Sequence, residues 1–325
     1  MKDRALTRDS NMELLRITVM FLILLLHANY FTFGSPKDHS INSLLRCAAQ
    51  SFCSVAVPTF VLITGWFGTT FKKEKIFKLI YQVLFAVIII TLAILAFKGR
   101  GNEGLGATAA KFAFWKYWFI NAYLGLLVIV PFLNMGVEKF SKKQMLIFLG
   151  VFYVIFAVPD FLFGAPGFGV IGGNSAIWFV FLYMLGRYLR LYPLNLKTGV
   201  LILIFLAGLA GETALLFFHI RGADIDSPFI VMECVSLLLL FSKLSFKSKA
   251  VNWIAASSTM VYLTNLHPVL VDYFTGGLKK LEAENTTPKW LVFCFVFCIV
   301  WFVASILFDK LRILTYRIFK PKRAE

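Results

Sequence analysis

Ten long apolar segments, separated by polar and basic connections, constrain the fold of this chain more than any other feature. Each is close to the roughly 20 residues that a helix needs to cross a bilayer. A soluble chain of this length could not bury so much apolar surface. We therefore expect an all-α polytopic protein of the cell membrane with about ten transmembrane helices. The segments cover residues 14–34, 52–71, 79–97, 117–134, 145–163, 168–186, 199–219, 225–242, 251–275 and 290–308.

Lys and Arg residues are distributed unevenly over the connections between these segments. If the N-terminus is cytoplasmic, the segments on that side contain 22 of the 33 basic residues, and the opposite connections contain 10. Cytoplasmic loops of membrane proteins carry such an excess. We therefore expect both termini to be cytoplasmic. The same bias accounts for much of the net charge of +16, so nucleic acid is not an expected partner.

The chain is expected to form a single integral-membrane domain over residues 1–325, without an appended soluble domain. The first segment does not read as a cleavable signal peptide, because it is too long and contains Arg16 and His27. The five cysteines lie in or beside the apolar segments without a Cys-x-x-Cys spacing. We therefore expect neither a disulfide framework nor a metal site.

Two ionisable side chains, Arg16 and His27, lie in the first apolar segment, where such groups are costly. They are eleven residues apart, so they share one helix face and are separated by about 16 Å along the axis. Arg16 is expected near the cytoplasmic end, where Glu13 can pair with it and where a snorkelling anchor is the alternative. For His27, beyond mid-membrane, the alternative is a hydrogen-bonded packing residue. Because the two share a face, we favour a functional role.

Three other segments carry ionisable groups at a depth similar to that of His27. The helix rise places His27 and Glu212 about 10 Å, and Glu233 and His267 about 12 Å, below the expected external ends of their helices. We therefore expect an outward-opening polar cavity around His27. In it, Glu212 or Glu233 can orient the imidazole and stabilise its protonated form. The alternative is that each glutamate bonds structurally to a neighbouring helix.

Short motifs follow one another along the whole chain in a characteristic order. Asn11 to Arg16, followed by ten residues and His27, forms an Arg-x10-His motif. Residues 55–67 contain a Val-Pro-x-Phe stretch that ends in Thr-Gly-Trp-Phe, and two further motifs lie at residues 118–134 and 181–190. In this order and spacing the motifs resemble those of the acyltransferase-3 family of integral-membrane acyltransferases. The resemblance covers essentially the whole chain.

The resemblance implies transfer of an acyl group, usually acetyl, from cytoplasmic acyl-CoA to a sugar of a surface polysaccharide or its lipid-linked precursor. It implies a catalytic site at His27 and Arg16, to which the depth of the glutamates adds Glu212 and Glu233. The polyanionic nucleotide of acetyl-CoA should dock on the basic cytoplasmic face. The candidate donor ligands, each of which is also an ordinary positive-inside residue, are Arg16, Lys72, Lys73, Arg187 and Arg190.

Some positions depart from the family pattern. Thr64 stands where a serine is usual, and Lys72 and Lys73 follow the second segment where many relatives have arginines. Residues 261–268 resemble the family's Tyr-Leu-Ile-His stretch. Asn265 stands where the histidine is common, and His267 follows two residues later.

The expected chemistry starts from a sugar hydroxyl, which is a poor nucleophile at neutral pH. A histidine is suited to take its proton during attack on the thioester. We prefer this direct transfer, and an acyl-histidine intermediate is the alternative route. The competing class is a transporter or flippase for a glycan or lipid precursor, since buried ionisable groups also suit proton coupling. No two similar halves are visible, and the first-segment motif favours the enzyme.

Overall fold

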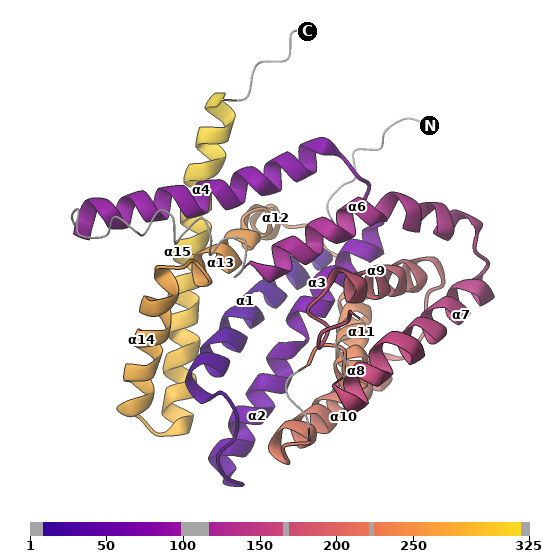
Figure 1. Ribbon diagram of the computed structural model, residues 1–325, viewed down its shortest axis with the longest axis horizontal. Helices are drawn as coiled ribbons and strands as arrows, with labels where there is room; N and C mark the ends of the chain where they lie inside the picture. Colours follow the sequence, from indigo (N-terminus) through magenta and orange to yellow (C-terminus); the bar gives the residue numbers. More distant parts are fainter. Residues whose placement is uncertain (1–8, 99–116, 165–168, 221–223, 320–325) are drawn as a thin grey trace.

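The computed structural model describes residues 9–98, 117–164, 169–220 and 224–319, and over these residues it is helical and contains no strand (Figure 1). The predicted all-α class is therefore confirmed. The helices are α1 (Ser10–Phe33), α2 (Ile41–Ser54), α3 (Ala56–Phe67), α4 (Lys73–Lys98), α6 (Trp118–Lys139), α7 (Lys142–Phe152), a π-helical turn η2 (Tyr153–Ala157), α8 (Val158–Phe163), α9 (Ala176–Leu191), α10 (Thr198–Phe217), α11 (Pro228–Ser242), α12 (Lys249–Ala255), α13 (Ser258–Asn265), α14 (Leu270–Ala283) and α15 (Thr287–Phe319).

Seven helical segments among the described residues are long and apolar enough to cross a membrane. They are α1, α2 with α3, α4, α6, α7 to α8, α10 and α15, and α11 is a shorter apolar helix. Each of the ten predicted segments overlaps a helix or consecutive helices, but the sixth, 168–186, was predicted to begin too early, because α9 starts only at Ala176. Ten crossings and cytoplasmic termini stay predictions. Large apolar side chains on these helices face outward, as contact with lipid requires, among them Phe97, Phe132, Phe163, Leu203 and Val300.

The first helix, α1, lies in the middle of the bundle and packs against α2, α3 and α11 to α15. Its side chains are buried on several faces, and Leu15, Val19 and Leu24 are fully enclosed. A helix that is apolar around its whole circumference is typical of such a central position. α1 ends at Gly34, which has a φ of 68° that other residues rarely adopt. The central position of α1 brings both ends of the Arg16–His27 face into contact with the rest of the bundle.

The second predicted segment begins earlier than expected. The sequence analysis placed its start at residue 52, but α2 begins at Ile41 and continues through a bend at Val55 into α3. Its first half is polar because Ser43, Arg46 and Gln50 are buried against other helices rather than against lipid. A segment predicted from apolar composition alone cannot include these polar residues.

A close backbone contact joins α3 to α9. A Cβ atom on Gly65 would overlap the carbonyl group of Tyr183, and one on Gly186 would overlap the carbonyl oxygen of Leu62. Small residues at such positions let membrane helices approach closely. This contact fixes Trp66 of α3 beside the last turns of α9, which carry Arg187 and Arg190.

The ninth predicted segment, 251–275, is not one continuous helix. It is divided into α12, α13 and α14, with breaks at Ala256–Ser257 and at residues 266–269. Pro268 lies in the second break, where it lacks the N–H group needed to continue a helix. Polar side chains of Asn265 and His267 flank this break inside the bundle.

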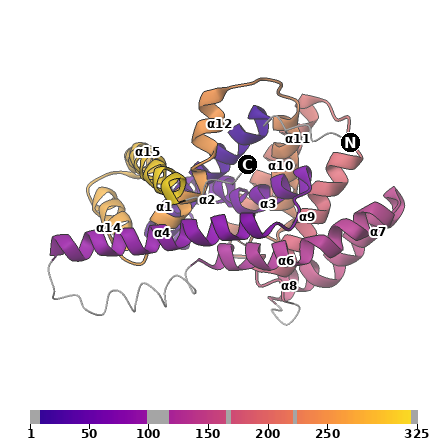
Figure 2. The ribbon, with the colours of Figure 1, turned by 90° about the horizontal axis from the view of Figure 1, so that it is seen from above.

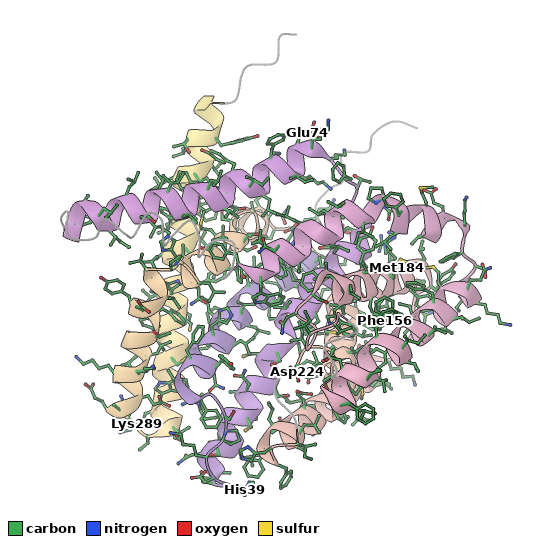
Figure 3. The ribbon with its side chains drawn as sticks, in the orientation of Figure 1. His39, Glu74, Phe156, Met184, Asp224 and Lys289 are labelled. Atoms are coloured by element: carbon green, nitrogen blue, oxygen red, sulfur yellow. The ribbon has the colours of Figure 1, made fainter. Side chains whose placement is uncertain are left out.

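Two ends of the molecule can be followed in the figures. Glu74 of α4 lies at one end, and His39 before α2 and Lys289 at the start of α15 lie at the other (Figure 3). Turned by 90°, the molecule shows α15 almost end-on while α4 runs across it (Figure 2). α4 is attached there by hydrogen bonds from Tyr81 to Thr315 and from Gln82 to Asp309.

Candidate functional site

His27 lies in the second half of α1, and its ring contacts the end of α13. Its Nδ1 atom is 2.5 Å from Oδ1 of Asn265, the last residue of α13. The ring of Phe31, one turn further along α1, is centred 5.6 Å from the imidazole. His27 is half-buried, whereas Asn265 is fully buried. The imidazole is thus held between the central helix and the break in the ninth predicted segment.

Arg16 lies eleven residues before His27 and pairs with Glu13 on the same helix. Its Nη1 atom donates to both carboxylate oxygens, at 2.9 Å and 3.1 Å, so this pairing is confirmed. The guanidinium carbon lies 5.9 Å from the ring centre of Phe60 in α3. Because 27% of the Arg16 side chain is exposed, the guanidinium group remains accessible to a ligand.

Glu212 and Glu233 are both fully buried where α10 packs against α11. Glu212 accepts a hydrogen bond of 2.6 Å from the Ser227 hydroxyl, while neither carboxylate oxygen of Glu233 has a hydrogen-bond partner. The His27 Nδ1 atom is bonded by the amide of Asn265 and by neither glutamate. The close approach of α11 to Gly208 places the Glu233 side chain against α10 instead. Catalytic roles for the two glutamates stay predictions.

A second buried arginine, Arg46 of α2, lies near the other end of α1. Its Nε and Nη2 atoms donate to Asn29 Oδ1 and to Thr32 Oγ1, both on α1, the latter at 2.6 Å. Nη1 donates to Glu282 of α14 at 2.8 Å, and the guanidinium carbon lies 3.7 Å from the ring centre of Trp290 in α15. Only 3% of the Arg46 side chain is exposed. This cluster fastens four helices together and leaves little of the cation accessible.

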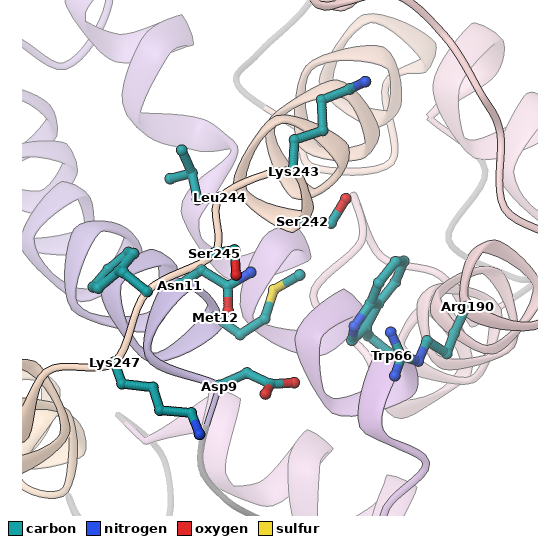
Figure 4. Close-up of a pocket in the computed structure, with 11 residues that line it drawn as sticks. Asp9, Asn11, Met12, Trp66, Arg190, Ser242, Lys243, Leu244, Ser245 and Lys247 are labelled. Carbon is teal, nitrogen blue, oxygen red and sulfur yellow. The ribbon is translucent and has the colours of Figure 1, made fainter.

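A pocket of about 330 Å³ opens where the first turn of α1 meets the ends of α3, α9 and α11 (Figure 4). Trp66 and Arg190 lie beside each other on one wall, with the guanidinium carbon 5.1 Å from the indole ring centre. Lys243 and Lys247 come from the end of α11 and the segment after it, and Asp9 precedes α1. Basic side chains outnumber the single acidic one, so the pocket suits an anionic ligand.

The pocket wall is anchored by hydrogen bonds from the start of α1. Asn11 donates to the carbonyl oxygen of Phe241 at 3.0 Å, and the backbone N–H of Ser248 donates to the Ser10 hydroxyl at 2.9 Å. Met12 forms part of the lining, and Arg16 lies one turn further along the same helix face. The pocket, Arg16 and His27 therefore succeed one another along α1.

The other candidate donor ligands lie near this pocket or apart from it. Arg190 lines it, and Arg187, one turn earlier on α9, lies against Gly68 at the end of α3. The Nε atom of Arg187 is buried and has no hydrogen-bond partner. Lys72 and Lys73 are exposed at the start of α4 and do not belong to the pocket lining. The sequence does not single out three residues of the lining, Trp66, Lys243 and Lys247. Positive charge is visible in the sequence, but the pocket itself is not.

Thr64 and His267, which depart from the family pattern, both bond within the bundle. The Thr64 hydroxyl lies 3.3 Å from the hydroxyl of Tyr123 in α6. His267 Nδ1 accepts from the backbone N–H of Val269 at 3.3 Å, and its Nε2 lies 3.5 Å from the carbonyl oxygen of Val87. His267 thus bridges the helix break to α4. Asn265, and not His267, is the residue of this stretch that contacts His27.

Metal-binding groups do not cluster in the part of the chain that the structure describes. There, no three His, Cys, Asp or Glu side chains lie close enough together to hold a metal ion. All five cysteines are buried and free.

A comparison with known families adds to this geometry. The model of the acyltransferase-3 family, described as an acyltransferase domain, matches residues 9–308. No curated protein and no solved structure was found to match the chain. The matched region includes Arg16, His27, Asn265 and the whole lining of the pocket. The chain therefore belongs to the acyltransferase-3 family.

Proposed function

We propose that this membrane acyltransferase moves an acyl group, acetyl by expectation, from cytoplasmic acyl-CoA to a hydroxyl of a surface polysaccharide or lipid-linked glycan. The observation that carries the proposal is the succession of a basic pocket, Arg16 and His27 along one face of α1. Arg16 and His27 are about 16 Å apart along the helix axis. An extended donor can therefore bind at one end and react at the other.

The pocket is the proposed docking site for the nucleotide part of acyl-CoA. Arg190, Lys243 and Lys247 supply positive charge for its phosphates, and the buried Trp66 ring supports the Arg190 guanidinium. Further basic groups lie close in sequence to the pocket residues. Arg187, whose buried Nε has no hydrogen-bond partner, is one turn before Arg190, and the exposed Lys72 and Lys73 follow α3. Arg16 then lies where the chain of the donor leaves the pocket toward His27.

His27 is the proposed general base. The imidazole takes the proton of the acceptor hydroxyl while that oxygen attacks the thioester carbonyl carbon. The carbon–sulfur bond breaks, and the departing thiolate takes the proton from the imidazolium to give CoA thiol. The acceptor sugar would approach from the side of the membrane opposite the donor pocket. A near-neutral ordinary pKa is what suits a histidine to both proton transfers.

The test is transfer by the purified full-length protein in lipid nanodiscs, supplied with acetyl-CoA and a candidate acceptor glycan. We expect release of CoA thiol and a mass increase of the glycan by one acetyl group. His27→Ala should lower the rate by about 100-fold or more, the size of a general-base contribution, without loss of acetyl-CoA binding. His39→Ala, at an exposed histidine outside the site, is the matched control.

Two outcomes would contradict the proposal. Acetylation by His27→Ala at the wild-type rate would remove the base assignment. Acceptor movement across the bilayer without any CoA release would favour the transporter class instead.

A further inference from the structure

The side-chain oxygen of Asn265 determines which nitrogen of His27 can act as a base. An amide oxygen accepts hydrogen bonds and cannot donate them. At 2.5 Å from Asn265 Oδ1, Nδ1 of His27 must therefore carry the hydrogen in this contact. The neutral ring then keeps its lone pair on Nε2.

The surrounding structure holds Asn265 in place. It is the last residue of α13, and both neighbours before it are tied to other helices. The hydroxyl of Thr264 lies 2.7 Å from that of Ser305 in α15, and the carbonyl of Leu263 accepts a hydrogen bond of 2.7 Å from Tyr117. His267 bridges the following break to α4. Because the backbone on both sides is fixed, the amide has little freedom to turn away from the imidazole.

We infer that Asn265 is a positioning residue that holds His27 in the tautomer with hydrogen on Nδ1, so that Nε2 receives the proton of the acceptor hydroxyl. This inference rests on the proposed function. As Nε2 takes the proton and the ring becomes an imidazolium, the bond from Nδ1–H to the amide oxygen strengthens, because the donor is now charged. The proton then passes from Nε2 to the departing sulfur, and the ring returns to the same tautomer.

The orientation of the Asn265 amide decides which tautomer of His27 is favoured. Asn265 Nδ2 is buried and has no partner, so no neighbouring group fixes it in the resting site. With the amide reversed, Nδ2 would donate to Nδ1 and the hydrogen would have to sit on Nε2. That ring could not accept a proton at Nε2. The two amide orientations therefore favour opposite tautomers of His27. An aspartate at position 265, which can only accept, keeps the contact of the first orientation and loses that of the reversed one.

The tautomer can be measured without any assay of activity. We propose ¹⁵N NMR of the full-length protein in nanodiscs, labelled at histidine, with His39, His219 and His267 removed one at a time for assignment. We expect the protonated nitrogen of His27 to be Nδ1 in the wild type and to change to a mixture in Asn265→Leu. Hydrogen on Nε2 in the wild type would overturn the inference.

Kinetics provide the second test, with Asn265→Leu, Asn265→Asp and, as a control in the same helix, Thr259→Val. Loss of one hydrogen bond to a charged ring should lower kcat at least about 10-fold in Asn265→Leu, with an unchanged KM for acetyl-CoA. Asn265→Asp should retain more activity, and the midpoint of its pH–rate profile should move upward, because a carboxylate favours the imidazolium. Thr259→Val should keep the wild-type midpoint.

Other ionisable groups lie on helices that pack against α1, among them Glu233, Cys294 and Cys298, and His267 lies in the break between α13 and α14. They are the same in every variant, so the difference between variants reports on Asn265. A wild-type kcat and midpoint in Asn265→Leu would overturn the inference, as would equal losses in all three variants. If His27→Ala is inactive while Asn265→Leu is normal, only the positioning role fails. If His27→Ala is active, the proposed function fails with it.

Discussion

Arg16 and Arg46 lie at opposite ends of α1 and differ in how completely the protein satisfies them. Arg16 has one carboxylate partner on its own helix, and 27% of its side chain is exposed. Arg46 bonds to two side chains of α1 and to one of α14, stacks on Trp290, and is 3% exposed. A buried cation with a full set of partners is structural, whereas a partly exposed one beside a basic pocket retains capacity for a ligand.

Replacing Arg46 should give the largest change in stability. Arg46→Leu removes the link between α1, α2, α14 and α15 and leaves the Asn29 carbonyl oxygen without its donor. Hydrogen bonds of a charged group contribute about 1.5–3 kcal/mol, so losing those of the buried Arg46 should lower the unfolding free energy by at least that amount, although Glu282 itself is 35% exposed. Thermal unfolding in nanodiscs should show the loss, and Lys280→Ala, an exposed cation on the same end of α14, should not. A normal unfolding temperature for Arg46→Leu would remove the structural half of the comparison.

Replacing Arg16 should change function more than stability. Loss of a charged hydrogen bond to the donor is worth about 1.5–3 kcal/mol, so Arg16→Ala should raise the KM for acetyl-CoA about 10- to 100-fold. The unfolding temperature should fall less than in Arg46→Leu, because Arg16 bonds only within its own helix, although the partner Glu13 is buried. An unchanged KM together with lower stability would make Arg16 a second structural arginine, and the proposed difference between Arg16 and Arg46 would then be wrong.

The sequence predicts the ionisable residues Arg16 and His27 of α1 much better than the Arg46 cluster that packs against the same helix. Arg16 and His27 follow directly from helical periodicity and from the cost of charge in hydrocarbon. Arg46 was placed in an external connection because the apolar pattern of the second segment begins after it. In the structure, the polar residues in the first half of α2 are buried against other helices instead of facing water. Composition cannot make this distinction, because a buried polar network and a solvated loop have the same residue types.

Asn265 shows a different limit of sequence reasoning. Ionisable groups were sought as partners of His27, and a neutral amide gave no signal of that kind. The apolar pattern also predicted one unbroken helix over residues 251–275, although Pro268 was visible in it. Only the folded chain shows that the break turns Asn265 toward α1 and His267 toward α4. The all-helical class needed no such information, because periodicity and length determine it.

Binding of acetyl-CoA at the pocket near Arg16 should change little on single substitutions and strongly with the salt concentration. Lys243→Ala removes one solvent-accessible charge from the pocket, and exposed charge pairs are worth about 0.2–1 kcal/mol. We expect the KM for acetyl-CoA to rise about two- to fivefold at low ionic strength and the difference to disappear in about 1 M salt. Lys197→Ala, an exposed cation at the start of α10, is the matched control. A difference that persists in high salt would indicate a structural role for Lys243.

The smallest effect is expected at Asp38, in the connection between α1 and the helix that carries Arg46. Asp38 accepts hydrogen bonds from the backbone N–H and hydroxyl of Ser40 and from the hydroxyl of Ser43, and these lower its pKa from its ordinary value near 3.8 to about 2. A lowered carboxyl pKa stabilises the fold above the unfolded value, and the stabilisation is lost as pH falls from about 4 to about 2. Asp38→Asn should therefore lower the unfolding temperature slightly between pH 5 and 7, and the difference from wild type should shrink below pH 4. The KM for acetyl-CoA should not change, because Asp38 lies at the end of α1 opposite the proposed donor pocket. A difference in unfolding temperature that is the same at pH 3 and pH 7 would show that the charge of Asp38 contributes nothing to the start of α2.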